Sequence, residues 1–348
     1  MLDITQIDKN FVVQTNLNKE DICFVNALEA PFSLHGLMYE DGGYRRMPLA
    51  AAQSVSERVT ALSTSCAGGR LRFRTDSPYI AISAQMPRIS RMSHFALTGS
   101  AGFDLYKDGR YVKTFVPPLA TTDGFESLIE VGESGMGEYT IHFPLYSAVS
   151  RLYIGLSKGA TVLKPTPYAV ERPIVYYGSS ITQGGCASRA GNAYTNMLSR
   201  RLNAEHINLG FSGSALAEDA MADYISGLSM AAFVYDYDHN APTAEHLERT
   251  HEKMFQKIRK ANPSLPILIL SRPKYFLTDE ELRRLEIIRT TYRHAVEAGD
   301  RNVYFMDGPA LMALAGDEGT VDNCHPTDLG FASMAKAMEP CLRKILNL

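Results

Sequence analysis

The 348-residue chain is long enough to form two domains, each with a hydrophobic core of its own. Its formal net charge of -3 and its 21% of charged residues exclude the strongly basic surface that nucleic acid or an anionic membrane would select. We therefore expect a small or neutral partner, with neither nucleic-acid nor membrane binding.

The cysteines and the first residues bear on the compartment. The five cysteines are scattered and contain no Cys-x-x-Cys pair, which argues against a disulfide framework and a zinc knuckle. The N-terminus carries early acidic residues and lacks the basic and apolar regions of a signal peptide, and no later run approaches the length of a membrane span. These features predict a cytoplasmic protein with reduced thiols; they predict no particular oligomer.

Short strands separated by turns dominate the first part of the chain. Residues 1–40 contain short apolar runs, such as residues 11–13, and predict no definite element. Beyond them, strands are predicted at residues 71–74, 79–85, 102–106, 111–115, 127–131, 138–143 and 151–156. The pair Asp108-Gly109 is typical of a two-residue hairpin turn. This pattern predicts an antiparallel, jelly-roll-like β-sandwich domain over residues 1–165.

The aromatic residues of this part fall at strand-like spacings, which favours core packing over a sugar-binding platform. The chain has no Trp at all, which weakens the platform interpretation further. We expect this domain to pack on the following one and to wall its pocket.

The pattern changes after residues 157–172, a stretch with Gly159, Pro165 and Pro167 that is typical of a linker. Strands are then predicted at residues 174–177, 206–209, 231–235, 266–270 and 303–306. Helices are predicted at residues 192–202, 215–225, 244–261, 279–298 and 328–346. Alternating apolar strands and helices predict a doubly wound α/β domain with a parallel sheet over residues 172–348.

Residues 174–184 read Ile-Val-Tyr-Tyr-Gly-Ser-Ser-Ile-Thr-Gln-Gly and contain a candidate nucleophile. The buried strand ends at the turn Gly178-Ser179-Ser180, and the carboxyl ends of parallel strands are where open α/β sheets bind ligands. Ser180 is therefore a candidate nucleophile. The alternative is an ordinary turn with a helix N-cap.

Asp322 and His325 supply what a nucleophilic serine needs. A serine hydroxyl requires a neutral imidazole to take its proton, and a carboxylate that binds one ring nitrogen fixes the tautomer of that imidazole. We predict His325 as the base and Asp322 as its orienting group. The alternative is that Asp322 and Asp328 only cap the last helix.

Together these segments resemble the SGNH hydrolases, also called the GDSL esterase and lipase family. The resemblance covers Arg172 to the C-terminus and rests on Gly178-Ser179-Ser180, Asn208-Leu-Gly-Phe-Ser-Gly213, Asp236-Tyr-Asp-His-Asn240, Asp322 and His325. Two motifs depart from the family pattern, because Ser179 replaces an acidic residue and Asp-Tyr-Asp-His-Asn replaces Gly-x-Asn-Asp. The resemblance implies a flavodoxin-like sheet and, as in several family esterases acting on carbohydrates, a jelly-roll-like domain ahead of it.

The resemblance also implies donors for the negative oxygen of a tetrahedral intermediate. These are the backbone N–H groups of Ser180 and Gly213 and the side-chain amide of Asn240. Gly213 has an alternative interpretation as a strand-to-helix turn, and Asn240 as an Asx-turn residue before Pro242.

Two arginines, Arg189 and Arg272, follow the nucleophile segment and a strand end, so either could bind a substrate hydroxyl or carboxylate; the alternative is surface arginine. Neither a metal nor another cofactor is predicted. His246 and His251 lie five residues apart on a helix and so do not share a face for zinc with Asp236, Asp238 and His239. Cys324 is interpreted as a packing residue.

The sequence thus predicts a serine esterase or deacetylase that hydrolyses a small acyl ester, such as acetyl, on a carbohydrate. The carbohydrate and the acyl group are implied by the resemblance rather than by residue spacing. Two alternatives stay open: a thioesterase or short-chain lipase-like hydrolase, and a non-catalytic protein whose glycine-rich turn binds an anion at a helix N-terminus.

Overall fold

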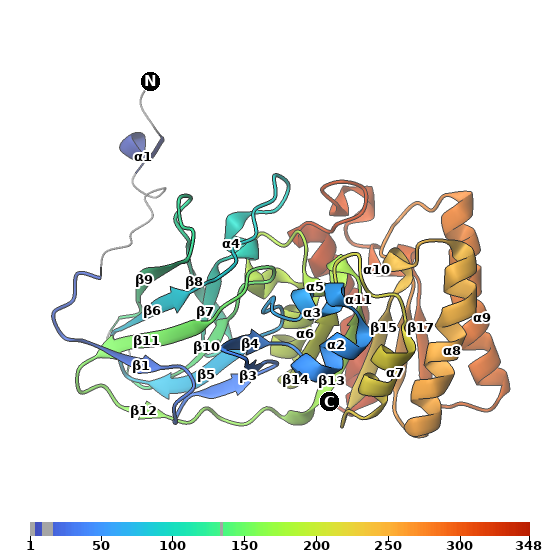
Figure 1. Cartoon of the computed structure of the whole chain (residues 1–348), viewed down its shortest axis with the longest axis horizontal. Helices are drawn as coiled ribbons and strands as arrows, with labels where there is room; N and C mark the ends of the chain where they lie inside the picture. Colours follow the sequence, from blue (N-terminus) through green and yellow to red (C-terminus); the bar gives the residue numbers. More distant parts are fainter. Residues whose placement is uncertain (1–3, 9–16, 133–134) are drawn as a thin grey trace.

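The computed structural model describes residues 4–8, 17–132 and 135–348 of the chain, so the apolar run at residues 11–13 lies outside the described part. A half built of antiparallel strands and a half built of alternating strands and helices lie side by side along the long axis (Figure 1). Within the described residues, no helix is both long and apolar enough to span a membrane.

The first half is a sandwich of two antiparallel sheets. One sheet has the order β1 (Ile22–Asn26), β11 (Arg151–Ser157), β6 (Tyr79–Gln85), β9 (Gly124–Glu130). The other has the order β12 (Val162–Leu163), β5 (Arg70–Thr75), β10 (Gly137–His142), β7 (Phe103–Lys107), β8 (Arg110–Phe115), with β2 (Ser33–His35) also paired to β5. Buried side chains from both sheets, among them Phe73, Ile82 and Phe103, form a shared core, as a sandwich requires.

All seven strands predicted for this half are present, with ends shifted by up to three residues. Asp108 and Gly109 form the hairpin turn between β7 and β8, with φ of 48° and 76°. Positive φ at both central residues is the geometry that matches the twist of the flanking strands. The remaining elements of this region are short: α1 (Ile4–Ile7), β3 (Met38–Glu40), β4 (Gly43–Arg45) and α4 (Leu97–Ser100).

The second half contains a five-stranded parallel sheet in the order β14 (Ala204–Gly210), β13 (Val170–Gly178), β15 (Ala232–Asp236), β16 (Ile267–Leu270), β17 (Val303–Met306). This is the flavodoxin-like order, and it confirms the predicted doubly wound fold. Alternate residues of β13 face opposite cores: Ile174 and Tyr176 join one cluster, Val175 and Tyr177 the other.

Helices cover both faces of this sheet. The first face packs on α6 (Tyr194–Leu202) and α11 (Asp328–Leu346). The second packs on α7 (Asp219–Ser226), α8 (Ala244–Ala261) and α9 (Asp279–Glu297). Two shorter helices, α5 (Ser180–Gln183) and α10 (Gly308–Leu311), lie near strand ends.

The helix predicted at residues 215–225 begins four residues later, at Asp219. The preceding segment is held by a tertiary contact: the Ala217 N–H donates to the Tyr177 hydroxyl at 3.0 Å, and Ala217 has a φ of 56°. A backbone in that conformation does not continue a right-handed helix.

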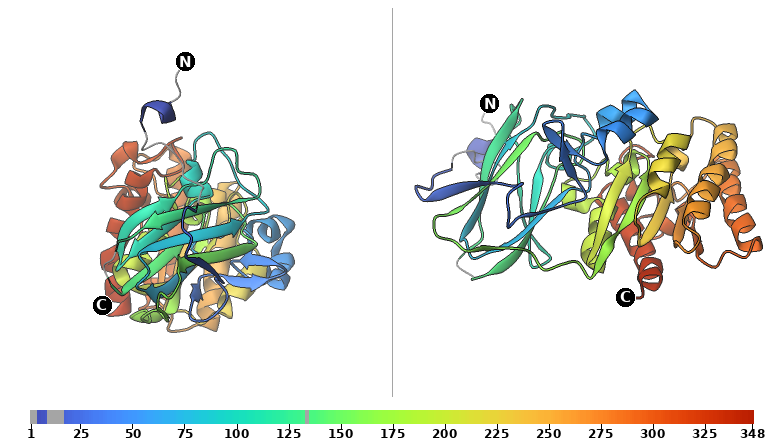
Figure 2. Two further views of the ribbon diagram at one scale, coloured as in Figure 1. Left: turned by 90° about the vertical axis from the view of Figure 1, so that its left-hand side faces the viewer. Right: turned by 60° about the horizontal axis from the view of Figure 1, so that its bottom comes forward.

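A helical pair from the first part of the chain packs on the second half. The helices are α2 (Leu49–Val55) and α3 (Glu57–Leu62), and Ala52 and Val59 share a core with Tyr177. Figure 2 shows this blue pair beside the strands of the parallel sheet. Such short helices carry too little periodicity to be recognised, and the sequence analysis missed them.

The predicted linker is also more ordered than its prolines indicate. Val162 and Leu163 pair with β5, and β13 already begins at Val170, so the connection is reduced to residues 164–169. We propose that the two domains divide between residues 165 and 172. Helices α2 and α3 then form a segment of the first domain that packs on the second.

Candidate active site

Ser180 lies where β13 gives way to α5, at the carboxyl edge of the parallel sheet. Gly178 permits the close approach of β15 at this strand end, because a Cβ there would lie only 2.1 Å from the Asp236 carbonyl oxygen. The Ser179 hydroxyl caps α5 by accepting from the Ile181 N–H at 3.1 Å. Since Ser179 makes the cap, the Ser180 hydroxyl is available to another partner.

That partner is His325. The Ser180 Oγ lies 2.9 Å from His325 Nε2, and His325 Nδ1 lies 2.7 Å from Asp322 Oδ2. Asp322 Oδ1 also accepts from the backbone N–H groups of His325 at 2.7 Å and Cys324 at 3.1 Å. The structure thus brings the three predicted residues into one line of hydrogen bonds.

The alternative role of the two aspartates as helix caps does not fit their contacts. Asp328 accepts from the backbone N–H of Ser188 at 2.8 Å and from the Asn192 amide at 2.8 Å. Partial burial alone would raise the pKa of Asp322, but hydrogen bonds from the ring and backbone of His325 outweigh it, and the pKa lies below its usual value. Asp322 is therefore a charged acceptor for the histidine.

The loop after β14 lies beside this line of side chains. Gly213 has a φ of 63°, in the region that favours glycine, and the Ser212 N–H donates to Gln183 Oε1 at 3.0 Å. Asn240, the last residue of the 3-10 helix η3 (Asp238–Asn240), donates its amide to the Phe211 carbonyl at 2.7 Å. This is a bond to another segment rather than a local Asx turn, and it leaves the second N–H of the amide free to point elsewhere.

Arg46 supports the same loop, and the sequence analysis missed it. Its buried guanidinium donates to the carbonyls of Asn208, Gly210 and Leu62 and stacks on Phe211. Burial lowers the pKa of Arg46 to about 9. No motif surrounds this residue in the sequence, because its partners in the loop after β14 lie more than 160 positions away.

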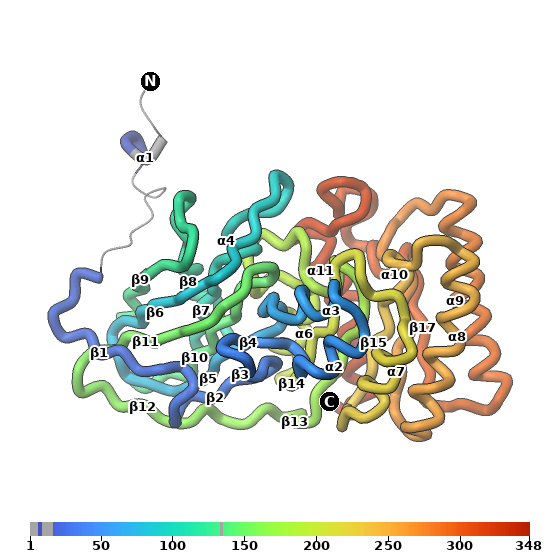
Figure 3. The backbone as a smooth tube through the Cα atoms, viewed as in Figure 1, coloured from blue at the N-terminus to red at the C-terminus, as the bar shows by residue number. Residues whose placement is uncertain are grey.

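His94 is a second residue that the sequence analysis missed. A turn in which the Phe95 N–H donates to the Met92 carbonyl at 3.2 Å holds it on a loop of the sandwich. Phe95 anchors this loop against Tyr146, and the rings of His94 and His325 lie 5.9 Å apart. Figure 3 shows the turquoise loop around residue 94 and the red loop before α11 on the same side of the molecule. The sandwich therefore packs on the α/β half at its site edge, as expected.

Both arginines considered for substrate binding hold ion pairs. Arg189 binds Asp104 at 2.8 Å and the Tyr106 hydroxyl at 2.6 Å, across the two halves. Arg272 binds Asp238 at 2.9 Å and Glu281 at 3.2 Å. A substrate would have to compete with these partners, and the predicted binding role stays a prediction.

The residues weighed as a zinc cluster have other contacts. Asp236 accepts from the hydroxyls of Thr182 at 2.9 Å and Tyr194 at 3.1 Å. His251 stacks on Tyr235 with ring centres 4.5 Å apart, and His246 Nε2 lies 3.0 Å from the Leu216 carbonyl. Cys324 Sγ lies 3.7 Å from His239 Nδ1.

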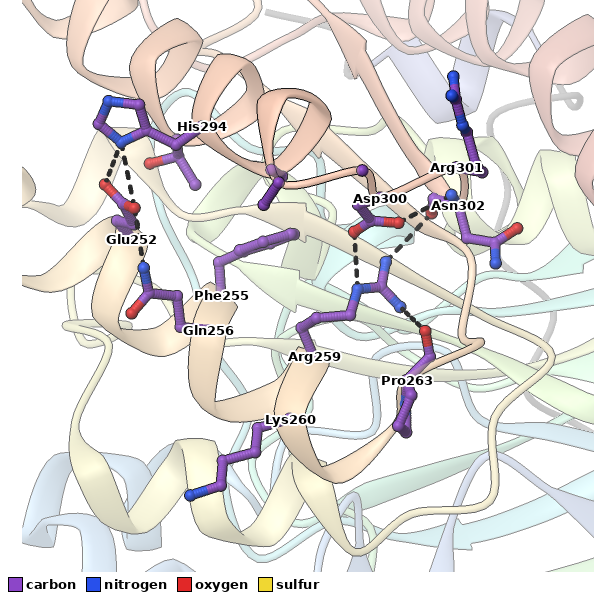
Figure 4. A pocket seen from close by; sticks show the side chains of 14 residues that line it. Glu252, Phe255, Gln256, Arg259, Lys260, Pro263, His294, Asp300, Arg301 and Asn302 are labelled. Carbon is purple, nitrogen blue, oxygen red and sulfur yellow. Dashed lines mark hydrogen bonds and ion pairs between the residues drawn. The ribbon is translucent and has the colours of Figure 1, made fainter.

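A separate hollow of about 590 Å³ lies between α8 and α9 (Figure 4). Arg259 crosses it and binds Asp300 at 2.8 Å, while His294 binds Glu252 at 3.1 Å. None of the residues around Ser180 lines this hollow. Its size therefore does not make it the site of the chemistry.

Comparisons with known proteins identify the family to which the chain belongs. The GDSL-like Lipase/Acylhydrolase family matches residues 171–343, and the family described as "N-terminus of Esterase_SGNH_hydro-type" matches residues 22–162. A candidate GDSL-like lipase from Bacteroides ovatus has a TM-score of 0.84 and 29% identity, with 94% of this chain and 98% of that chain covered. No curated protein matches the chain.

Two further solved structures share the fold. The salicylyl-acyltransferase SsfX3 from a tetracycline biosynthetic pathway has a TM-score of 0.76 and 19% identity, covering 94% of this chain and 99% of that chain. A family two carbohydrate esterase from Clostridium thermocellum, in complex with cellohexaose, has a TM-score of 0.61 and 15% identity, covering 91% and 99%. The chain belongs to the SGNH hydrolases, as an ester-bond hydrolase of the GDSL-like lipase and acylhydrolase family with a β-sandwich N-terminal region.

Proposed function

We propose that the protein is a serine esterase that removes a small acyl group, such as acetyl, from a hydroxyl of a carbohydrate. The observation that carries this proposal is the line of hydrogen bonds from Ser180 through His325 to Asp322, at 2.9 and 2.7 Å, at the carboxyl edge of β13. Proton transfer from serine to imidazole requires this geometry.

In the proposed mechanism, the Ser180 Oγ attacks the ester carbonyl carbon while His325 Nε2 takes the hydroxyl proton. Asp322 keeps the other ring nitrogen protonated and stabilises the imidazolium that forms. The carbon–oxygen bond to the alcohol then breaks, the alcohol leaves with the proton from His325, and an acyl-serine remains. Water repeats the two steps, so that the acid leaves and Ser180 regains its proton.

The negative oxygen of each tetrahedral intermediate needs donors that are already in place. We assign these to the N–H groups of Ser180 and Gly213 and to the second amide N–H of Asn240. Ser180 is the first residue of α5, so its N–H has no partner within that helix. Within the described part of the chain, no hydrogen bond occupies the Gly213 N–H.

The saccharide part of the proposal has two supports. The fold is shared with a carbohydrate esterase that binds cellohexaose. A hollow of about 240 Å³ borders the histidine loop at Asn323, and the exposed rings of Tyr275 and Phe276 line it. Aromatic rings with one exposed face suit contact with a sugar ring.

The test compares wild type with Ser180→Ala on acetylated saccharides, an aryl acetate and an acyl thioester. We expect the variant to fold and to lose nearly all hydrolysis, and a serine-directed phosphonate to label wild type but not Ser180→Ala. Ser179→Ala is the matched control, because it removes the helix cap and costs about 1 kcal/mol of folding free energy but keeps the nucleophile.

If the phosphonate labels Ser180→Ala, or if this variant keeps activity within about tenfold of wild type, Ser180 is not the nucleophile. Preference for the thioester would favour the thioesterase alternative. A wild-type protein that neither reacts with the phosphonate nor hydrolyses any ester would favour the non-catalytic alternative.

A further inference from the structure

Three side chains beside Ser180 form a group that the proposed esterase mechanism does not explain. His94, Cys186 and His325 each offer one ligand atom, and these atoms all lie within 4.8 Å of one another. They come from the sandwich loop, from the segment after α5 and from the loop before α11. Because the three positions are far apart in the sequence, no metal-ligand spacing predicts this cluster.

The separations suit a small tetrahedral cation after a modest adjustment. Zinc holds imidazole nitrogen at about 2.0–2.1 Å and thiolate sulfur at about 2.3 Å, so two of its ligand atoms lie roughly 3.3–3.8 Å apart. His94 is exposed, so its ring can turn, while Cys186 is partly buried and held by a backbone bond to the Pro326 carbonyl at 3.3 Å. A shift of the ligand atoms by roughly 1 Å would therefore bring them to the separations found around zinc.

The ligand types select the class of metal. Imidazole nitrogen and thiolate sulfur favour zinc and its softer analogue cadmium over calcium and magnesium, which prefer oxygen. Asp322 holds His325 Nδ1 at 2.7 Å, so the nitrogen left for a metal is Nε2. A carboxylate behind a ligating histidine is also the usual support of a zinc site.

We propose that His94, Cys186 and His325 bind Zn²⁺ or Cd²⁺ and that this cation inhibits the esterase reversibly. The cation takes the lone pair of His325 Nε2 that would otherwise accept the Ser180 proton. The Cys186 thiol gives its proton to solvent as it binds. Since His94 belongs to the sandwich, the cation also links the two halves of the molecule.

The experiment uses the full chain, dialysed against EDTA and then titrated with zinc chloride. We expect calorimetry to show one site per chain, ester hydrolysis to fall at least about tenfold at saturation, and EDTA to restore it, in line with loss of the general base. EDTA should leave the turnover of the metal-free protein unchanged. Cobalt should give a thiolate-to-metal absorption band.

Two variants and one control make the result specific. Cys186→Ser and His94→Ala should each weaken zinc binding at least about tenfold, and Cys186→Ser should abolish the cobalt band while keeping metal-free hydrolysis. Cys324→Ser, which changes the neighbouring thiol, should bind zinc like wild type. Undiminished zinc affinity in both variants, absence of binding at millimolar zinc, or binding without inhibition overturns the proposal.

The inhibitory part rests on the proposed function, whereas the binding part does not. Calorimetry and the cobalt spectrum report the site even when no ester is hydrolysed. Failure of the esterase assignment is therefore distinguishable from failure of the metal site.

Discussion

Asn240 makes one contact in the ground state and is proposed to make a second in the transition state. Replacing it by Ala removes both, and the two losses affect different measured quantities. Loss of one oxyanion donor lowers kcat by roughly 100- to 1000-fold, about 2.7–4 kcal/mol, with little change in KM. The bond to the Phe211 carbonyl at 2.7 Å is lost as well, and a side-chain hydrogen bond contributes about 0.5–1.5 kcal/mol to stability. The effect on the activation free energy should therefore exceed the effect on folding.

Asn240→Asp sharpens the distinction. A carboxylate cannot donate to the Phe211 carbonyl, so two acceptor oxygens would face each other where the amide now bonds at 2.7 Å. The same charge lies beside the negative intermediate. We expect this variant to lose at least as much kcat as Asn240→Ala and to be less stable.

The assay measures kcat and KM on an aryl acetate together with unfolding in urea. Asn262→Ala is the control, because its amide donates to the Ser226 carbonyl at 3.0 Å far from Ser180. It should lose a similar amount of stability with no change in kcat. An Asn240→Ala variant within about tenfold of wild type in kcat, or an active Asp variant, refutes the assignment.

Three other expectations concern pH and the buried arginine. Hydrolysis limited by chemistry should rise with pH, because only a neutral His325 can take the Ser180 proton, while Asp322, whose pKa lies below its usual value, stays charged; a flat profile contradicts the base. Burial raises the pKa of Asp236 to about 7, so its contribution to stability is full below about pH 4 and is lost as pH rises through 7. In urea unfolding, the free energy of unfolding of Asp236→Asn should increase relative to that of wild type by up to ~4 kcal/mol as pH rises across that range. A difference that stays constant with pH would contradict the raised pKa. Arg46→Met should cost about 3 kcal/mol or more of unfolding free energy, because the buried carbonyls of Asn208 and Gly210 and the partly buried carbonyl of Leu62 lose their donor. It should also lower kcat, and an unchanged unfolding curve in urea would contradict this role.

The sequence alone determined the order of the α/β half. Strands β15, β16 and β17 are nearly continuous apolar runs, and the helices have apolar residues at helical spacing, so these elements show their own burial. The bounds of α8, β17 and α11 agree with prediction. The sequence also pointed to Ser180, Asp322 and His325, because a serine at a strand end has a chemical need for a base and an orienting group, which a polar loop supplied.

Only the tertiary structure decided which distant segments meet. The periodicity of a segment reports which of its faces is buried, but not the partner that buries it. The placement of α2 and α3 on the parallel sheet, the support of Gly210 by Arg46, and the approach of His94 to His325 are contacts of this kind. Each is a contact between segments more than 100 residues apart, fixed when the two halves pack together, and no local pattern encodes it.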